Sequence, residues 1–350
     1  MEKFQHGGQI YKADGSTGDW LDFSANINPL GLSPFVKKAL AENIGGIVNY
    51  PDPAATELKN ALTAHYKIPA ENLVLLNGAA EFFYLFLNTF RPKKVTIPVP
   101  SFSEYEKAAV ATNCEINFFV TKAAENFSVN IEKLIKEIVE KGSDCVIIGQ
   151  PNNPTGTFLS VEKILRLAKV AKVIVDESFI DFLPNAESCR NFVDGGKIFA
   201  VQSLTKFFAI PGLRLGFAVA EKKFAERLNF CKDVWNVNFL AQKAGVAALA
   251  DEKFISSTRE RLKEEKKFFV GQLKKIRKVE VFEPSANFVL FRVNSDKAKN
   301  LLKKMRDEKI LLRSCENFVG LDEKYFRSAI RSREENIRLL DALKNFSEDF

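Results

Sequence analysis

A lysine with hydroxyl groups shortly before it and an arginine shortly after it is the first group of residues that could do chemistry. In the segment Ser203-Leu-Thr-Lys206-Phe-Phe-Ala-Ile-Pro-Gly-Leu-Arg214, Ser203 and Thr205 precede Lys206 and Arg214 follows it. A buried lysine with apolar and cationic neighbours has a lowered pKa and becomes an amine nucleophile for an aldehyde. The hydroxyls and the guanidinium are donors suited to a phosphate dianion. A lysine in an exposed loop would look the same in sequence, so other segments must decide.

A second candidate is Asp176, which ends the apolar run Val173-Ile-Val-Asp176. An unpaired carboxylate at the end of a buried strand would be costly, so it needs a cationic partner. A protonated pyridine nitrogen is such a partner, and the pairing makes the ring an electron sink. The alternative is an aspartate that merely caps a following helix.

Two turns that follow other apolar runs could hold the rest of a phosphorylated ring. In Gln150-Pro-Asn-Asn153-Pro-Thr-Gly156, proline and glycine fix a turn, and the Asn153 amide could donate to a phenolate oxygen. In Leu76-Asn77-Gly-Ala-Ala-Glu81, a strand leads through a glycine into a helix. The free N–H groups of Ala79 and Ala80, with the helix dipole, would then bind a phosphate. Each turn alone is a weak signal, and the combination predicts the site.

The polar candidates all lie at the ends of apolar runs, and this indicates where they meet. Short apolar runs alternate with helix-length amphipathic segments from about residue 70 to 220, as in a mainly parallel sheet covered by helices. The expected strands are residues 73–76, 94–98, 116–120, 145–148, 173–176, 198–202 and 215–219. Ligands bind beyond the carboxyl ends of strands in such α/β sheets, so the candidates are expected to share one crevice.

The pattern changes after about residue 240, where long charged helices are followed by a second α/β segment. Strands are expected there near residues 287–293 and 310–313, with a final helix from about 333 to 346. We therefore expect an α/β protein with three parts: an N-terminal arm of residues 1–35 that joins the small domain, a large domain of residues 36–245, and a small α/β C-terminal domain of residues 246–350.

The four segments occur in the order found in the fold-type I pyridoxal-phosphate (PLP) enzymes, the aspartate-aminotransferase superfamily, which the chain resembles over nearly its whole length. The resemblance implies that Lys206 is the Schiff-base lysine, that Asp176 pairs with the pyridine nitrogen and that Asn153 contacts the cofactor O3′. The residues that match the cofactor-phosphate positions are Ala79, Ala80, Ser203, Thr205 and Arg214. It also implies that Phe102 stacks on the cofactor ring. Tyr50 would reach the cofactor phosphate of a neighbouring subunit, so a homodimer would share its active sites.

Within this superfamily the chain is similar to histidinol-phosphate aminotransferases and closer still to the threonine-phosphate decarboxylases of cobalamin synthesis. The segments that carry this resemblance are His6-Gly-Gly8, residues 22–31, residues 101–105, residues 176–182 and residues 325–336. They imply decarboxylation of O-phospho-L-threonine or O-phospho-L-serine, with a histidinol-phosphate-type transamination as the alternative. One departure favours the decarboxylases: Phe179 stands where the aminotransferases usually have a tyrosine, three residues after the aspartate.

The same resemblance places the substrate. The expected substrate-binding residues come from the start, middle and end of the chain: His6, Gly7, Gly8, Asn28, Asn153, Arg327 and Arg331. Arg327 matches the arginine that binds the α-carboxylate, an anion that suits its planar guanidinium. Arg331, with His6 and the Gly7 and Gly8 backbone, would face the substrate phosphate. A structural ion pair is an equally good interpretation of Arg331.

Composition argues against several other classes of protein. The net charge is +7, but the basic residues alternate with acids in amphipathic segments such as residues 259–267, which is typical of a solvated helix and not of a nucleic-acid surface. No apolar run is long enough to span a bilayer, and the first residues lack the apolar core of a signal peptide.

Cysteine and histidine content points the same way. Five scattered cysteines without a CxxC pair, and only two histidines, argue against disulfides and against any metal site, and favour the reduced cytoplasm. A nucleotide-binding protein is disfavoured because neither GxGxxG nor GxxxxGK[ST] occurs. A PLP-fold protein without catalysis would be expected to lack Lys206 or Asp176.

Overall fold

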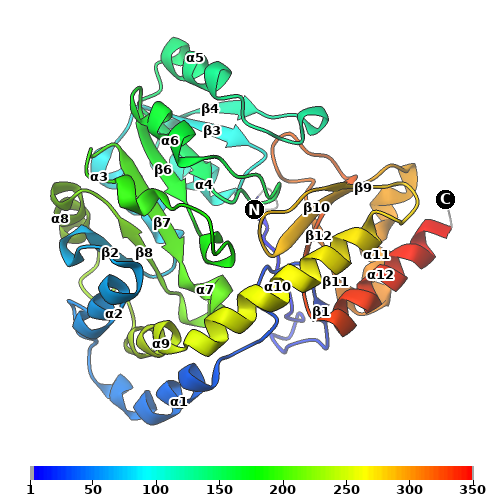
Figure 1. The fold of residues 1–350 in the computed structure, drawn as a ribbon, viewed down its shortest axis with the longest axis horizontal. Helices are drawn as coiled ribbons and strands as arrows, with labels where there is room; N and C mark the ends of the chain where they lie inside the picture. Colours follow the sequence, from blue (N-terminus) through cyan, green and yellow to red (C-terminus); the bar gives the residue numbers. More distant parts are fainter. Residues whose placement is uncertain (1–3, 349–350) are drawn as a thin grey trace.

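The computed structural model describes residues 4–348, which form a large unit built on a seven-stranded sheet and a smaller α/β unit beside it (Figure 1). The strand order of the large sheet is β2-β8-β7-β6-β5-β3-β4. Strand β8 runs antiparallel to both of its neighbours, and the remaining pairs are parallel. The strands are β2 (Leu73–Leu76), β3 (Lys94–Val99), β4 (Glu115–Val120), β5 (Cys145–Gly149), β6 (Lys172–Asp176), β7 (Ile198–Ser203) and β8 (Gly216–Val219). The predicted mainly parallel sheet is confirmed.

Helices cover both faces of this sheet, which is why its strands are continuous apolar runs. Alternate side chains point to opposite faces: Val173 and Val175 of β6 join one apolar cluster, and Ile174 joins the other. One face is covered by α3 (Glu81–Phe90), α4 (Glu104–Ala111) and α8 (Lys222–Cys231). The other is covered by α2 (Thr56–Tyr66), α5 (Ile131–Lys141), α6 (Val161–Ala168) and α9 (Phe239–Ala250).

The smaller unit is an antiparallel sheet with helices against it. Its strand order is β12-β13-β10-β9, from β9 (Val279–Phe282), β10 (Phe288–Val293), β12 (Arg313–Ser314) and β13 (Tyr325–Ala329). The helices are α11 (Leu301–Asp307) and α12 (Arg333–Glu348), and the long α10 (Glu252–Leu273) runs past both units (Figure 1). The expected strand near 310–313 is two short strands in different sheets, because β11 (Ile310–Leu311) pairs with β1 (Leu21–Asp22) instead of β13.

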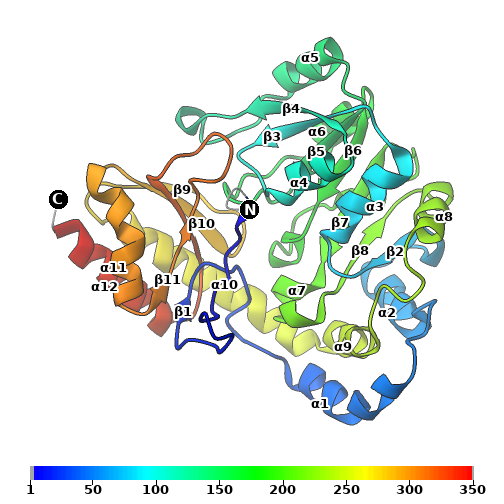
Figure 2. The same cartoon turned by 180° about the vertical axis from the view of Figure 1, so that it is seen from behind.

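The start of the described chain lies between the two units (Figure 2). The pairing of β1 with β11 fixes the following segment to the smaller unit, and α1 (Pro34–Asn43) then packs against α9. The domain limits given above stay a prediction, and residues 1–3 and 349–350 of those ranges lie outside the described residues. The remaining helical pieces are α7 (Leu204–Phe207) and short 3-10 turns at Ile44–Val48, Ala70–Asn72, Ala123–Glu125, Ile180–Phe182, Cys189–Phe192, Pro211–Leu213 and Asp296–Asn300. Over the described part of the chain, no helix combines the length and apolarity that crossing a membrane requires.

Candidate active site

Lys206 lies in α7, the single helical turn that directly follows β7. Its Nζ donates to Ser203 Oγ at 3.0 Å and lies 5.6 Å from the centre of the Phe179 ring. Burial lowers the pKa of the Lys206 amine to about 8; the charge of Arg214 adds to this effect and that of Asp176 opposes it. An appreciable fraction of the amine is therefore uncharged near neutral pH, as a nucleophile requires.

Asp176 ends β6, the strand next to β7, and its carboxylate is buried and fully oriented by donors. Oδ2 accepts from the Tyr105 hydroxyl at 2.7 Å, and Oδ1 accepts from the Ser178 N–H at 2.9 Å. Burial and the neighbouring Asp176 raise the pKa of Tyr105 well above its usual range, so the phenol stays protonated and donates a hydrogen bond to Asp176. Sequence reasoning missed Tyr105, although it lies only three residues after Phe102.

The groups predicted to bind the cofactor phosphate come together from two loops. A Cβ placed on Gly78 would lie 2.3 Å from Arg214 Nη2, so the guanidinium packs directly on the loop after β2. The Gly78 φ of +80° is a second reason for glycine there. Among the residues that the structure describes, the N–H groups of Ala79 and Ala80 donate to no acceptor.

The hydroxyls of the other loop complete this group of donors. Ser203 Oγ and Thr205 Oγ1 lie 2.8 Å apart, and both residues are buried. β8 can approach the Ala79 N–H closely because Gly216 has no side chain: a Cβ there would lie 2.7 Å from that nitrogen. Two backbone N–H groups, two hydroxyls and a guanidinium beside the half-buried Lys206 fit the phosphate of PLP.

Arg327 connects the two units at the predicted substrate side. Its Nη1 donates to Asn153 Oδ1 at 2.5 Å and its Nη2 to the Ser24 carbonyl at 2.5 Å. Burial lowers the pKa of Arg327 to about 10, so the guanidinium is still charged at neutral pH. Within residues 4–348, its Nε is buried without a hydrogen-bond partner.

The first residues of the described chain lie against the same place. The His6 ring is 5.3 Å from the Phe102 ring, and Phe102 in turn packs edge-on against Tyr105. The Gly8 N–H donates to Ser24 Oγ at 2.8 Å, and a Cβ on Gly7 would clash with the Ser24 carbonyl. The structure thus brings His6 to Phe102, and Gly7 and Gly8 to Ser24, the residue that Arg327 also contacts. Ser24 was not among the predicted residues.

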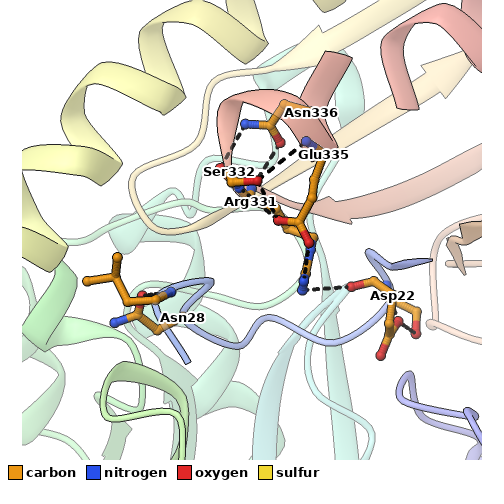
Figure 3. A network of polar contacts seen from close by, with 8 residues as sticks. Asp22, Asn28, Arg331, Ser332, Glu335 and Asn336 are labelled. Atoms are coloured by element: carbon orange, nitrogen blue, oxygen red, sulfur yellow. Dashed lines mark hydrogen bonds and ion pairs between the residues drawn. The ribbon is translucent and has the colours of Figure 1, made fainter. Parts of the chain in front are cut away.

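Arg331 and Asn28 make hydrogen bonds within the protein itself (Figure 3), although the Arg331 Nε, like that of Arg327, is buried without a hydrogen-bond partner in the described chain. Arg331 Nη2 pairs with Glu335 Oε1 at 2.6 Å, and Nη1 donates to the Asp22 carbonyl at 3.1 Å. The Asn28 amide donates to the Phe207 carbonyl and to Thr258 Oγ1. Of the two interpretations of Arg331, the ion pair is therefore present, and the substrate contacts of both residues stay predictions.

Tyr50 lies at the surface of the described chain. It is 77% exposed and stacks on Trp235 with ring centres 4.2 Å apart. The predicted contact of Tyr50 with a neighbouring subunit's cofactor stays a prediction. No group of three or more histidine, cysteine or carboxylate side chains in the described chain is arranged to hold a metal ion.

The model of one protein family, aminotransferase class I and II, matches residues 18–343. The chain belongs to this family. It is an enzyme, and its cofactor is PLP, which the donor set around Lys206 fits.

Relatives from two branches of the aminotransferase class I and II family resemble the chain over nearly its whole length. The threonine-phosphate decarboxylase of Salmonella typhimurium is 36% identical over 97% of this chain and 96% of its own. The crystal structure of the histidinol-phosphate aminotransferase from Clostridium acetobutylicum superposes with a TM-score of 0.87 at 33% identity, covering 94% of this chain and 99% of the other. For the L-threonine-O-3-phosphate decarboxylase from Porphyromonas gingivalis the TM-score is 0.83 at 29% identity, with 93% and 99% covered.

Proposed function

We propose that this PLP enzyme decarboxylates a small O-phospho-L-amino acid, with O-phospho-L-threonine as its first substrate. The observation that carries the proposal is the full-length similarity to the Salmonella typhimurium threonine-phosphate decarboxylase. The product from phosphothreonine would be aminopropanol phosphate. O-phospho-L-serine lacks one methyl group, and a pocket distinguishes one methyl group by only about 1–3 kcal/mol, so it is the second substrate to test.

The residues at the site support this chemistry. When bound, PLP supplies the electron sink for the electron pair left at Cα as the bond to the carboxylate breaks. Asp176, held by Tyr105 and Ser178, would keep the pyridine nitrogen protonated. Arg327 offers a planar fork to the α-carboxylate. The Lys206 amine would carry the proton that replaces CO2 at Cα.

The opposite end of the substrate needs donors for a phosphate. We infer that His6 and the Gly7 and Gly8 backbone supply them, because these residues lie against Phe102 and Ser24 at the edge of the site. Glycines leave room for an anion beside the backbone, where the Gly8 N–H donates to Ser24 Oγ in the free protein, and a histidine can add an N–H donor.

Transamination of histidinol phosphate is the second candidate, favoured by the similarity to the Clostridium acetobutylicum structure. Phe179 argues against it. Its ring faces the Lys206 amine, where the aminotransferases of this group usually place a tyrosine hydroxyl. The aromatic ring also packs edge-on against Phe288, which leaves an apolar wall beside the lysine.

We further propose a homodimer in which Tyr50 reaches the partner's cofactor phosphate. Tyr50 belongs to an apolar surface that also includes Ile44, Ile47 and Val48, the last of them 84% exposed. Exposed apolar groups of this size mark protein interfaces, and a second copy of the chain would cover them.

The test uses purified, PLP-loaded protein. One tube receives O-phospho-L-threonine, a second O-phospho-L-serine, and CO2 release is followed in both. A third receives histidinol phosphate with 2-oxoglutarate and is assayed for glutamate. CO2 without glutamate would support the decarboxylase and name its substrate, whereas glutamate without CO2 would refute it and make the protein an aminotransferase.

A further inference from the structure

We propose that Glu104 is a positioning residue that holds His6, and with it the N-terminal segment, over the substrate side of the site. The inference rests on the proposed phosphoamino-acid substrate. Glu104 begins α4, two residues after Phe102, and is only 8% exposed. A carboxylate so little exposed needs a reason to be there, since burial of a charge is costly without partners.

Three donors compensate that burial. Glu104 Oε1 accepts from His6 Nε2 at 2.8 Å and from Lys107 Nζ at 3.2 Å, and Oε2 accepts from the Tyr84 hydroxyl at 2.9 Å. Burial alone would raise the pKa of Glu104, but these hydrogen bonds outweigh it and lower the pKa to about 2. The carboxylate is therefore ionised at any pH at which the enzyme works.

An ionised carboxylate can only accept hydrogen bonds, so the proton between the two groups belongs to His6 Nε2. This fixes the orientation of the imidazole and leaves Nδ1 as its other polar atom. A phosphate oxygen also only accepts, so a phosphate at Nδ1 requires a proton on that nitrogen as well. Glu104 thus orients the imidazole, next to Phe102, for such a contact.

The contact also crosses between the two units. Next to His6, the Gln5 carbonyl accepts from Arg313 Nη2 at 2.7 Å, and Arg313 belongs to β12 of the smaller unit. The Gly8 N–H donates to Ser24. Glu104 thus attaches His6 to the large unit, while Gln5 is bound to the smaller unit and Gly8 to Ser24. Together these contacts keep Gly7 and Gly8 where the substrate phosphate would lie.

The experiment compares four variants of the PLP-loaded enzyme: Glu104→Gln, His6→Ala, the double variant and Tyr84→Phe. With O-phospho-L-threonine, we expect Glu104→Gln and His6→Ala each to raise KM about tenfold, the loss expected for a hydrogen bond to a charged group. We expect kcat to change less than about twofold, because neither residue touches the reacting atoms. The double variant should be no worse than His6→Ala, since both changes remove the same contact.

Tyr84→Phe is the matched control, because it removes another hydrogen bond from Glu104 and leaves the His6 contact intact. Its KM should stay within about twofold of the wild-type value, as expected for a neutral hydrogen bond that is not part of the site. Equal KM changes in Glu104→Gln and Tyr84→Phe would overturn the proposal and show that Glu104 only packs α4 against α3. Independent, additive effects of Glu104→Gln and His6→Ala would overturn it as well.

A second measurement does not depend on turnover. Amide hydrogen exchange of residues 5–10, followed by mass spectrometry without substrate, should be about threefold faster in Glu104→Gln and unchanged in Tyr84→Phe, because a charge-assisted bond is replaced by a weaker neutral one. Unchanged exchange of residues 5–10 in Glu104→Gln would refute the proposal that Glu104 holds this segment. Wild-type enzyme that decarboxylates neither phosphoamino acid would refute the proposed function instead, and the exchange comparison would still decide whether Glu104 holds the segment.

Discussion

Arg327 and Arg331 lie four residues apart, and they differ in the kind of group that orients each guanidinium. Arg327 is buried in β13 and donates hydrogen bonds to two neutral groups, the Asn153 side-chain oxygen and the Ser24 carbonyl. Arg331 is paired with a carboxylate, Glu335, at the start of α12. Within the described chain, no carboxylate is hydrogen-bonded to Arg327, whereas Arg331 forms an ion pair with Glu335.

The comparison shows how a guanidinium can be held ready for an anion. Neutral oxygens orient the group without cancelling its charge, so an incoming carboxylate gains the full electrostatic attraction. A carboxylate partner orients the group equally well but competes with the ligand. We expect the type of partner, more than the burial of the arginine, to decide which of the two is available to a substrate anion.

The largest effect should come from Arg327→Met. Its loss would leave the Asn153 and Ser24 oxygens without their donor and would remove the fork for the α-carboxylate. We expect kcat/KM for the phosphoamino acid to fall on the order of a hundredfold or more, as for truncation of one partner of a buried charge pair. Steady-state kinetics measure it, and the cofactor absorbance serves as a control for folding. A loss of less than about fivefold would contradict the proposal that Arg327 binds the α-carboxylate and would remove its contrast with Arg331.

The second effect concerns Lys206, a half-buried cation. Burial lowers the pKa of Lys206 to about 8 and that of Arg327 to about 10, so only the lysine loses its proton near neutral pH. Only the neutral amine attacks an aldehyde, and its fraction falls about tenfold per pH unit below that pKa. The rate of PLP attachment to the apoprotein, measured by stopped-flow absorbance, should rise with pH up to about 8 and then level off. A rate that is flat from pH 6 to 8 would contradict the lowered pKa.

A smaller effect is expected from Arg331→Met. Removal of the Arg331–Glu335 pair should lower the free energy of unfolding by about 1 kcal/mol while KM stays within about threefold. Denaturant unfolding and kinetics are compared with Glu335→Gln, which removes the same pair and keeps Arg331. If Arg331→Met raised KM tenfold and Glu335→Gln did not, Arg331 would contact the substrate phosphate, and the contrast with Arg327 would fail.

The smallest expected effect is that of Phe179→Tyr. The Phe179 ring packs on Phe288, and the centre of the Phe288 ring lies 5.9 Å from the Arg327 guanidinium carbon. The change therefore tests the cofactor side of the region that contains Arg327. A new hydroxyl near Lys206 would donate to the cofactor phenolate and stabilise its charged form. The pH midpoint of the cofactor absorbance change should then fall by about half a unit. A midpoint that rises, in a protein of unchanged stability, would show that the hydroxyl points elsewhere.

The sequence predicted the large sheet well because both faces of its strands are buried. A strand such as Lys172–Asp176 is then an uninterrupted apolar run and is visible without knowledge of its neighbours. Two strands of the smaller sheet were not predicted. β13 carries Arg327 and Ser328 in its interior, and β9 is only half-buried, so neither shows a simple apolar pattern.

The site was predictable where a residue's role depends on its own element and not where it depends on a distant partner. Lys206 lies just after β7 and Asp176 is the last residue of β6, and the end of an apolar run is visible in the sequence. The contacts of Tyr105 with Asp176 and of Ser24 with Arg327 join distant segments, so no local spacing shows them. Arg331 is the opposite case, because a carboxylate four residues later, Glu335, was a sequence signal for the ion pair.

The packing of Arg214 on Gly78 has a consequence for how the protein folds. The donors for the cofactor phosphate come from loops far apart in the sequence, and the two groups of donors meet only when the edge strand β2 has paired with β8. A partly folded chain therefore has no high-affinity place for the cofactor. Because a ligand that binds only the native state stabilises it by mass action, free PLP should act as a folding ligand, and the holoenzyme should resist unfolding more as its concentration rises.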